Sequence, residues 1–278
     1  MTNAKQTAFL NLLFIIINCC WILIIDSNKL YGISIYETFS HNWSYLSPHI
    51  ATFNIWKVIT IALVVAGIFY CILLNKEEEL DEALINKIDA SGYWMITNQL
   101  LLGLSMVFKL NDCLFIAYLC SIGTYYSLTR LNIIFRIRDF KDSSIIHMFT
   151  RISLGIYSGW FTYLLAFNGI STLSNLFDLP SNHTLYFYVS MILLVGTFIF
   201  ITYKTLLCNL PAILAGYNVG VLGSYYFNLT SRNVNEFQLI MRYAFLTVLI
   251  ISLVIICYLL IAKRRTIIQS KINYNTKN

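Results

Sequence analysis

The chain has 278 residues, of which 58% are hydrophobic and only 12% are Asp, Glu, Lys or Arg, and its formal net charge is +6. A soluble domain carries about 25% charged residues, so this chain has too little charge to cover a surface that faces water. The composition excludes a cytosolic enzyme, a nucleic-acid-binding domain, a disordered regulator and a small disulfide-bonded scaffold. It predicts an all-α, polytopic membrane protein.

Charge-poor segments along the chain predict about eight transmembrane helices. Each segment is close to the roughly 17–25 helical residues that cross a hydrocarbon core. Inside lipid every backbone N–H and C=O group needs a partner within its own segment, which a helix provides. The expected spans are residues 8–25, 54–74, 92–109, 113–130, 149–171, 184–203, 206–227 and 239–262.

The basic residues predict the orientation of the chain. If the N-terminus is inside, most of the 19 lysines and arginines fall in inner segments, including the cluster at 263–265. Cytoplasmic segments carry an excess of Lys and Arg, so we expect both termini in the cytoplasm and the protein in the plasma membrane. The positive charge then follows from this bias and from a basic tail near anionic lipid, and it requires no nucleic-acid partner.

No arrangement of catalytic or metal-binding residues is visible. The seven cysteines contain no CxxC pair, and the four histidines lie outside the spans without clustered acids. We therefore expect no enzyme activity, no metal and no cofactor. No predicted span has a charged residue near its middle, which argues against ion-coupled transport because such transporters need buried charge.

The connection between the first two spans, residues 26–53, is the longest in the chain. It contains several aromatic residues, which commonly lie at the level of the lipid headgroups. A long ordered loop also suits a lid over a cavity. The candidates for such a lid are Tyr36, Trp43 and Tyr45.

The seventh predicted span, 206–227, is rich in glycine. Gly216 and Gly220 have the GxxxG spacing that lets two helices approach closely, and Gly223 follows them. We expect these glycines to serve packing within the chain, with a homodimer as the alternative.

The fifth predicted span, 149–171, has one aromatic and apolar face. Tyr157, Trp160, Leu164 and Asn168 are three or four residues apart and therefore share a face of a helix. Aromatic rings with one amide suit a pocket for a flat apolar ligand. Simple helix packing, with Asn168 bonded to a neighbouring backbone, is the alternative.

These residues resemble the fifth-helix signature of the TspO/translocator family, whose members are also called tryptophan-rich sensory proteins. The pattern in this chain is Tyr157-x-x-Trp160-x-Thr162-x5-Asn168. Leu164 occupies the position where the family usually has a small residue that faces the ligand.

Two further motifs are similar to the same family. Phe53-Asn-Ile-Trp56 resembles its second-helix motif, and Gln99-Leu-Leu-Leu resembles the motif in the helix before its tight hairpin. Here the hairpin would turn at Asn111-Asp112. The order of the elements also matches, from the first helix and long outer loop to the basic loop and signature helix.

The resemblance covers about residues 5–172 and implies a five-helix core, followed by three more helices over 173–262 and a basic cytoplasmic tail over 263–278. It also implies a pocket for a porphyrin-like, sterol-like or other planar apolar small molecule, used for sensing or transport. The residues that would line the pocket are Trp56, Tyr157, Trp160, Leu164 and Asn168.

Two other functions fit the sequence. One is a transporter that moves an apolar solute without ion coupling. The other is a structural or partner-binding membrane subunit, which would use either the acidic segment 76–89 or the glycine-rich seventh span.

Overall fold

The structure is a computed structural model, and it describes residues 2–28, 43–75, 82–139, 145–178, 183–230 and 235–275. Over these residues the chain forms helices and no strand, which confirms the all-α prediction. The elements are α1 (Thr2–Asn28), the short 3-10 helix η1 (Ile50–Asn54), α3 (Ile55–Asn75), α4 (Glu82–Leu110), α5 (Leu114–Ile134), α6 (Ile145–Phe177), α7 (Thr184–Cys208), α8 (Pro211–Thr230) and α9 (Glu236–Asn275).

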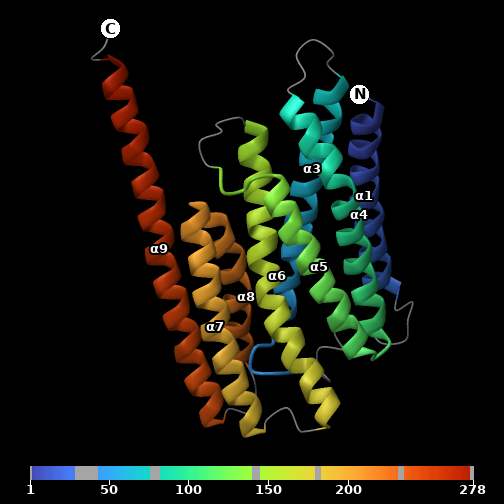
Figure 1. Cartoon of the computed structure of the whole chain (residues 1–278). Coiled ribbons are helices and arrows are strands. Elements are labelled where there is room, and N and C mark those ends of the chain that lie inside the picture. Colours follow the sequence, from blue (N-terminus) through green and yellow to red (C-terminus); the bar gives the residue numbers. More distant parts are fainter. Residues whose placement is uncertain are drawn as a thin grey trace.

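The eight α-helices of the described chain run alternately in opposite directions through one bundle (Figure 1). The amino-terminal end of α1 and the carboxy-terminal end of α9 therefore lie at the same end of the molecule. We call this the terminal end, and we call the other end, where α4 leads into α5, the hairpin end. The assignment of the terminal end to the cytoplasm stays a prediction.

Each α-helix of the described chain contains most of one predicted span, and several extend beyond it, such as α4, which begins at Glu82, and α9, which continues to Asn275. We expected the sixth and seventh spans to meet near Lys204, but α7 continues to Cys208. The break is at Asn209, which has the left-handed φ of 44° that asparagine tolerates better than most residues. The N–H of Leu210 bonds to the carbonyl of Thr205, and Pro211 opens α8, a position that needs no backbone donor.

Four segments are apolar enough to cross a membrane by length and composition alone: Asn3–Ile24, Ile50–Leu74, Thr184–Cys208 and Glu236–Ala262. Among the remaining helices, α6 lies at the centre and packs against α3, α5, α7 and α8. Most of its side chains are buried, including many polar ones. A helix surrounded by protein can carry polar residues, because they face partners and not lipid. The total of eight membrane crossings stays a prediction.

Helices α6 and α8 approach each other closely at glycines. A methyl group added at Gly159 would collide with the Ile213 carbonyl oxygen, and one added at Gly216 would collide with the Ile156 carbonyl oxygen. Gly220 would meet a tyrosine ring of α6 in the same way. The glycines of α8 therefore serve packing within the chain, which is the use that their spacing favoured.

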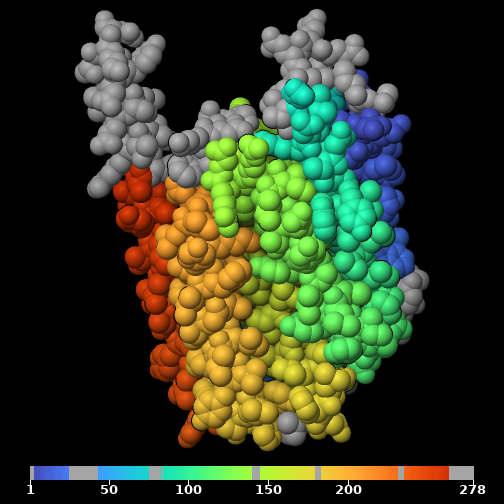
Figure 2. All heavy atoms as spheres, viewed as in Figure 1, coloured from blue at the N-terminus to red at the C-terminus, as the bar shows by residue number. Residues whose placement is uncertain are grey.

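The arrangement leaves α5 and α7 on opposite sides of α6. Figure 2 shows this face of the molecule, with α7 in orange and α5 in green on either side of the recessed α6. The main hydrophobic cluster extends through the bundle, from α1 through the central helix α6 to α9, and a smaller one joins the terminal ends of α1, α3 and α4. The predicted division of the chain at residue 172 thus falls within α6, whose two flanks share one core.

Candidate functional site

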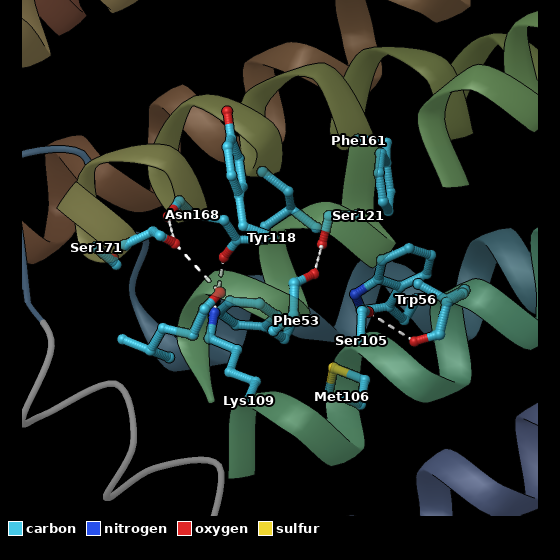
Figure 3. A pocket seen from close by; sticks show the side chains of 15 residues that line it. Phe53, Trp56, Ser105, Met106, Lys109, Tyr118, Ser121, Phe161, Asn168 and Ser171 are labelled. Atoms are coloured by element: carbon cyan, nitrogen blue, oxygen red, sulfur yellow. Dashed lines mark hydrogen bonds between the residues drawn. The ribbon is translucent and has the colours of Figure 1, made fainter. Parts of the chain in front are cut away.

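A small cavity lies at the hairpin end of the bundle, enclosed by η1, α3, α4, α5 and α6 (Figure 3). Its volume is about 40 Å³. Three of the five predicted site residues line it, namely Trp56, Leu164 and Asn168. The other lining residues are Phe53, Leu102, Ser105, Met106, Lys109, Leu114, Ala117, Tyr118, Ser121, Phe161, Ser171 and Thr172.

One end of the cavity is aromatic. The rings of Trp56 and Phe161 meet edge to face with 6.2 Å between their centroids. In Figure 3 these two side chains lie at the end away from Asn168 and Lys109. Edge-to-face rings give a rigid apolar wall, because each aromatic edge is attracted to its neighbour's face.

Trp160 lies directly behind this wall and does not line the cavity. Its ring is fully buried, 5.6 Å from the Phe53 centroid and 6.4 Å from the Trp56 centroid. The indole N–H of Trp160 has no hydrogen-bond partner in the described chain. A buried donor without a partner costs about 1–3 kcal/mol, so an acceptor that reached this group would stabilise the protein.

Tyr157 also lies outside the cavity, in a buried polar network that joins four helices. Its hydroxyl donates to Asn98 Oδ1 at 2.9 Å, and the Gln99 amide donates to the same oxygen at 3.1 Å. The Asn98 amide donates to the Thr124 carbonyl, and the Asn18 amide of α1 donates to Gln99 Oε1. Tyr157 therefore connects α6 to α4, while its ring contacts Trp56 at 5.6 Å.

The other end of the cavity is polar and holds a residue that sequence reasoning missed as a site residue. Lys109 donates from Nζ to Asn168 Oδ1 at 2.7 Å, and its ammonium lies 4.9 Å from the centroid of the Phe167 ring. No acidic side chain is among the described lining residues. A cation–π contact and a charge-assisted hydrogen bond together hold the ammonium group in place.

We interpreted Lys109 from the sequence only as a charge that sets orientation. The signal that points to the site is its position. Lys109 lies at the end of α4, where the chain turns into α5. Because α6 runs antiparallel to α5, the later turns of α6, which contain Asn168, lie at the same end of the bundle. The Asn168 side-chain oxygen accepts from a side chain, whereas the packing alternative supposed a bond to a neighbouring backbone.

The predicted lid residues have different positions. Tyr36 lies outside the described residues. The ring of Tyr45 packs against Phe187 of α7 and Phe237 of α9, at centroid distances of 5.9 and 6.5 Å, and Trp43 packs on Tyr45 at 5.8 Å. Neither Trp43 nor Tyr45 lines the cavity.

The described part of the connection between α1 and α3 is instead hydrogen-bonded to α6 and α8. The Leu46 carbonyl accepts hydrogen bonds from the Tyr163 hydroxyl at 3.1 Å and from the Ser224 hydroxyl at 2.9 Å. The Asn228 amide donates to the Tyr45 carbonyl at 2.9 Å. Residues 43–49 therefore form a buried connection between the central helix and the C-terminal helices.

Taken together, these features describe an integral membrane protein, a helical bundle with a small cavity that is apolar at one end and cationic at the other. The chain matches the family described as TSPO-like protein over residues 8–223, and it belongs to that family. The match continues beyond residue 172, through α7 and into α8. Neither a curated protein nor a solved structure matches the chain.

Proposed function

We propose that this protein binds a planar, largely apolar small molecule in the cavity at the hairpin end, for sensing or for transport. The observation that carries the proposal is the pairing of an aromatic wall at Trp56 and Phe161 with the Lys109–Asn168 hydrogen bond across the same cavity. A flat apolar body would pack on the rings, and an oxygen atom at one end would accept a hydrogen bond from Lys109. Membership of the TSPO-like family supports the same kind of ligand.

The ammonium group favours one of the two ligand classes that the sequence suggested. A charge-assisted hydrogen bond is roughly twice as strong as a neutral one, and burial strengthens it further. Porphyrin-like ligands carry carboxylates that would make such a bond with Lys109, whereas sterol-like ligands offer a neutral hydroxyl. We therefore propose a ligand with an acidic group.

Binding a ligand of this size requires the cavity to widen. A volume of about 40 Å³ accommodates two or three water molecules, whereas sites for drug-sized ligands measure roughly 300–1,000 Å³. Met106 and Trp56, both partly exposed, line the cavity, and an unbranched methionine adapts readily to new neighbours. We propose that these side chains move aside. The unpartnered Trp160 N–H behind Trp56 then offers the ligand a second hydrogen bond.

The test is a titration of the purified full-length protein in detergent with protoporphyrin and, separately, with its dimethyl ester, followed by tryptophan fluorescence. We expect saturable quenching by the free acid, with binding about tenfold weaker in Lys109→Gln, because one charge-assisted bond is lost. The ester, which has no carboxylate, should bind the wild type and Lys109→Gln equally.

The control variant is Lys57→Gln, which removes a positive charge from an exposed position of α3 outside the cavity. It should bind like the wild type. Linear quenching that is equal in all three proteins would mean that the cavity does not bind this ligand class.

A further inference from the structure

A second and much larger cavity lies at the terminal end of the bundle, between α5 and α7. Its volume of about 630 Å³ is in the range of small-molecule sites. The two helices both pack on α6, and direct contact between them is slight at most. The cavity is lined by the last turns of the two helices and the segment after α5: Thr129, Asn132, Ile133, Arg136, Ile137, Arg138, Asp139, Lys204 and Cys208.

The lining of this cavity is strongly basic. Arg136 and Arg138 are exposed on one side, and Lys204 is partly buried on the other, with its ammonium 5.7 Å from the Tyr125 ring centroid. Asp139 is the only acidic residue among the described lining residues. Three cations that face one space attract an anion, and their field is strengthened by the low-dielectric walls.

The backbone that carries the two arginines is held in place by a buried arginine of α6. Arg151 is only 5% exposed, and it donates from Nε to the Ile137 carbonyl and from Nη2 to the Cys208 carbonyl, both at 2.9 Å. One guanidinium group thus ties the two sides of the cavity together. Arg136 itself has the left-handed φ of 47°, which is costly for a residue with a side chain. Strained residues of this kind persist where the surrounding structure holds them, often at ligand sites.

A residue of the cavity lining, Asn132, has a buried side-chain oxygen without a partner in the described chain. Asn132 is 5% exposed and donates to the Ser158 hydroxyl at 2.8 Å, but its Oδ1 accepts no hydrogen bond in the described chain. A ligand that carries both negative oxygens and a hydroxyl group would satisfy the cations and this acceptor together.

We propose that this cavity binds a phosphate-bearing anion and that its natural source is the headgroup of an anionic phospholipid with hydroxyl groups. The apolar surroundings favour a lipid over a free ion. Ile133, which lines the cavity, is 61% exposed, and Tyr203 and Leu207, which adjoin the lining residues Lys204 and Cys208 in α7, are also exposed, so acyl chains would lie along α5 and α7. This site is separate from the cavity at the hairpin end and does not depend on the proposed function.

The experiment measures lipid binding to the detergent-solubilised full-length protein by native mass spectrometry. Phosphatidylglycerol and phosphatidylcholine with identical acyl chains are compared in the wild type and in the double variant Arg136→Gln/Arg138→Gln. We expect the wild type to prefer phosphatidylglycerol, and the double variant to bind it at least about tenfold more weakly. Lys204→Gln, on the other side of the cavity, should also weaken the binding of phosphatidylglycerol.

The charge-matched control is Lys57→Gln/Arg130→Gln, which removes two cations that do not line the cavity. Arg130 instead lies over the Trp94 ring. Equal loss of binding in this control, or equal binding of the two lipids to the wild type, would overturn the proposal. A second titration with inorganic phosphate separates the sources. If millimolar phosphate displaces phosphatidylglycerol and binds equally well alone, the lipid assignment is wrong, and if it does not, the headgroup is the ligand.

Discussion

Tyr157 belongs to the family motif, but its side chain joins two helices and does not line the cavity. Its ring is 1% exposed, and its hydroxyl donates to Asn98 at the point where α1, α4, α5 and α6 meet. Trp56 separates Tyr157 from the apolar end of the cavity. At this position the sequence motif therefore marks a contact between helices.

We predict that Tyr157→Phe lowers the free energy of unfolding by about 0.5–1.5 kcal/mol, since one buried hydrogen bond is lost and Gln99 still bonds to Asn98. Ligand affinity should stay the same. Unfolding in SDS and the protoporphyrin titration measure the two effects. Tyr126→Phe, at a position 58% exposed, is the control and should change neither. A large loss of protoporphyrin affinity without loss of stability would show that Tyr157 takes part in ligand binding.

Three of the five predicted site residues line the cavity, and the position of Trp56 explains why Tyr157 and Trp160 do not. The spacing of Tyr157, Trp160, Leu164 and Asn168 placed them correctly on one side of α6. The cavity, however, is lined on α6 only from Phe161 to Thr172, and the ring of Trp56 packs against the rings of Tyr157 and Trp160. A periodic pattern identifies a face of a helix, but not how far a neighbouring side chain extends over it.

At the scale of whole helices, the α6–α8 contact makes the sharpest prediction about stability. We predict that Gly159→Ala or Gly216→Ala destabilises the protein by at least about 1–3 kcal/mol, because each methyl group meets backbone that cannot move aside. Gly196→Ala, in α7, is the matched control. No atom lies within 4 Å of its added methyl group, so the helix-favouring alanine should be neutral or stabilising. Equal effects at all three positions would contradict the close contact.

The buried connection over residues 43–49 makes a separate prediction about local opening. In Asn228→Ala the Tyr45 carbonyl loses its donor, so the connection should open more often. The amide of His49, which donates to the Gly223 carbonyl at 3.0 Å, should then exchange its hydrogen faster. Thr230→Ala is the control, since that hydroxyl bonds only within its own helix. Unchanged hydrogen exchange at His49 in Asn228→Ala would show that the bonds to the Leu46 carbonyl are sufficient to hold the connection closed.

Which helices touch was harder to predict than where the helices are. Charge-poor runs located the eight α-helices of the described chain, because the length and composition of a membrane span are strongly constrained. The turn at Asn209 was misplaced by a few residues, since Lys204 lies within α7 and faces the basic cavity. The pairing of α6 with α8 depends on shape at Gly159 and Gly216, and glycine spacing alone does not name a partner.

For the whole molecule, the alternating helices predict which positions water reaches from each side of the membrane. In a variant without native cysteines, Lys5→Cys and Lys271→Cys should resist a membrane-impermeant thiol reagent in intact cells. Asn111→Cys, in the exposed turn between α4 and α5, should react. All three should react after the cells are opened. Labelling of either terminal position in intact cells would contradict the predicted orientation.

The hydrogen bonds of Arg151 have a consequence for the order in which the chain becomes stable during synthesis. If α6 spans the membrane as predicted, it is synthesised before the Cys208 carbonyl and the α8 backbone that pack against it. Until then, the Arg151 guanidinium group lacks the Cys208 carbonyl, and Gly159 lacks the α8 backbone that packs against it. Arginine stays protonated, and a charge in lipid is costly. A nascent chain that ends at residue 178 should therefore be held by the insertion machinery or degraded. Release into the bilayer should require residues up to about 230.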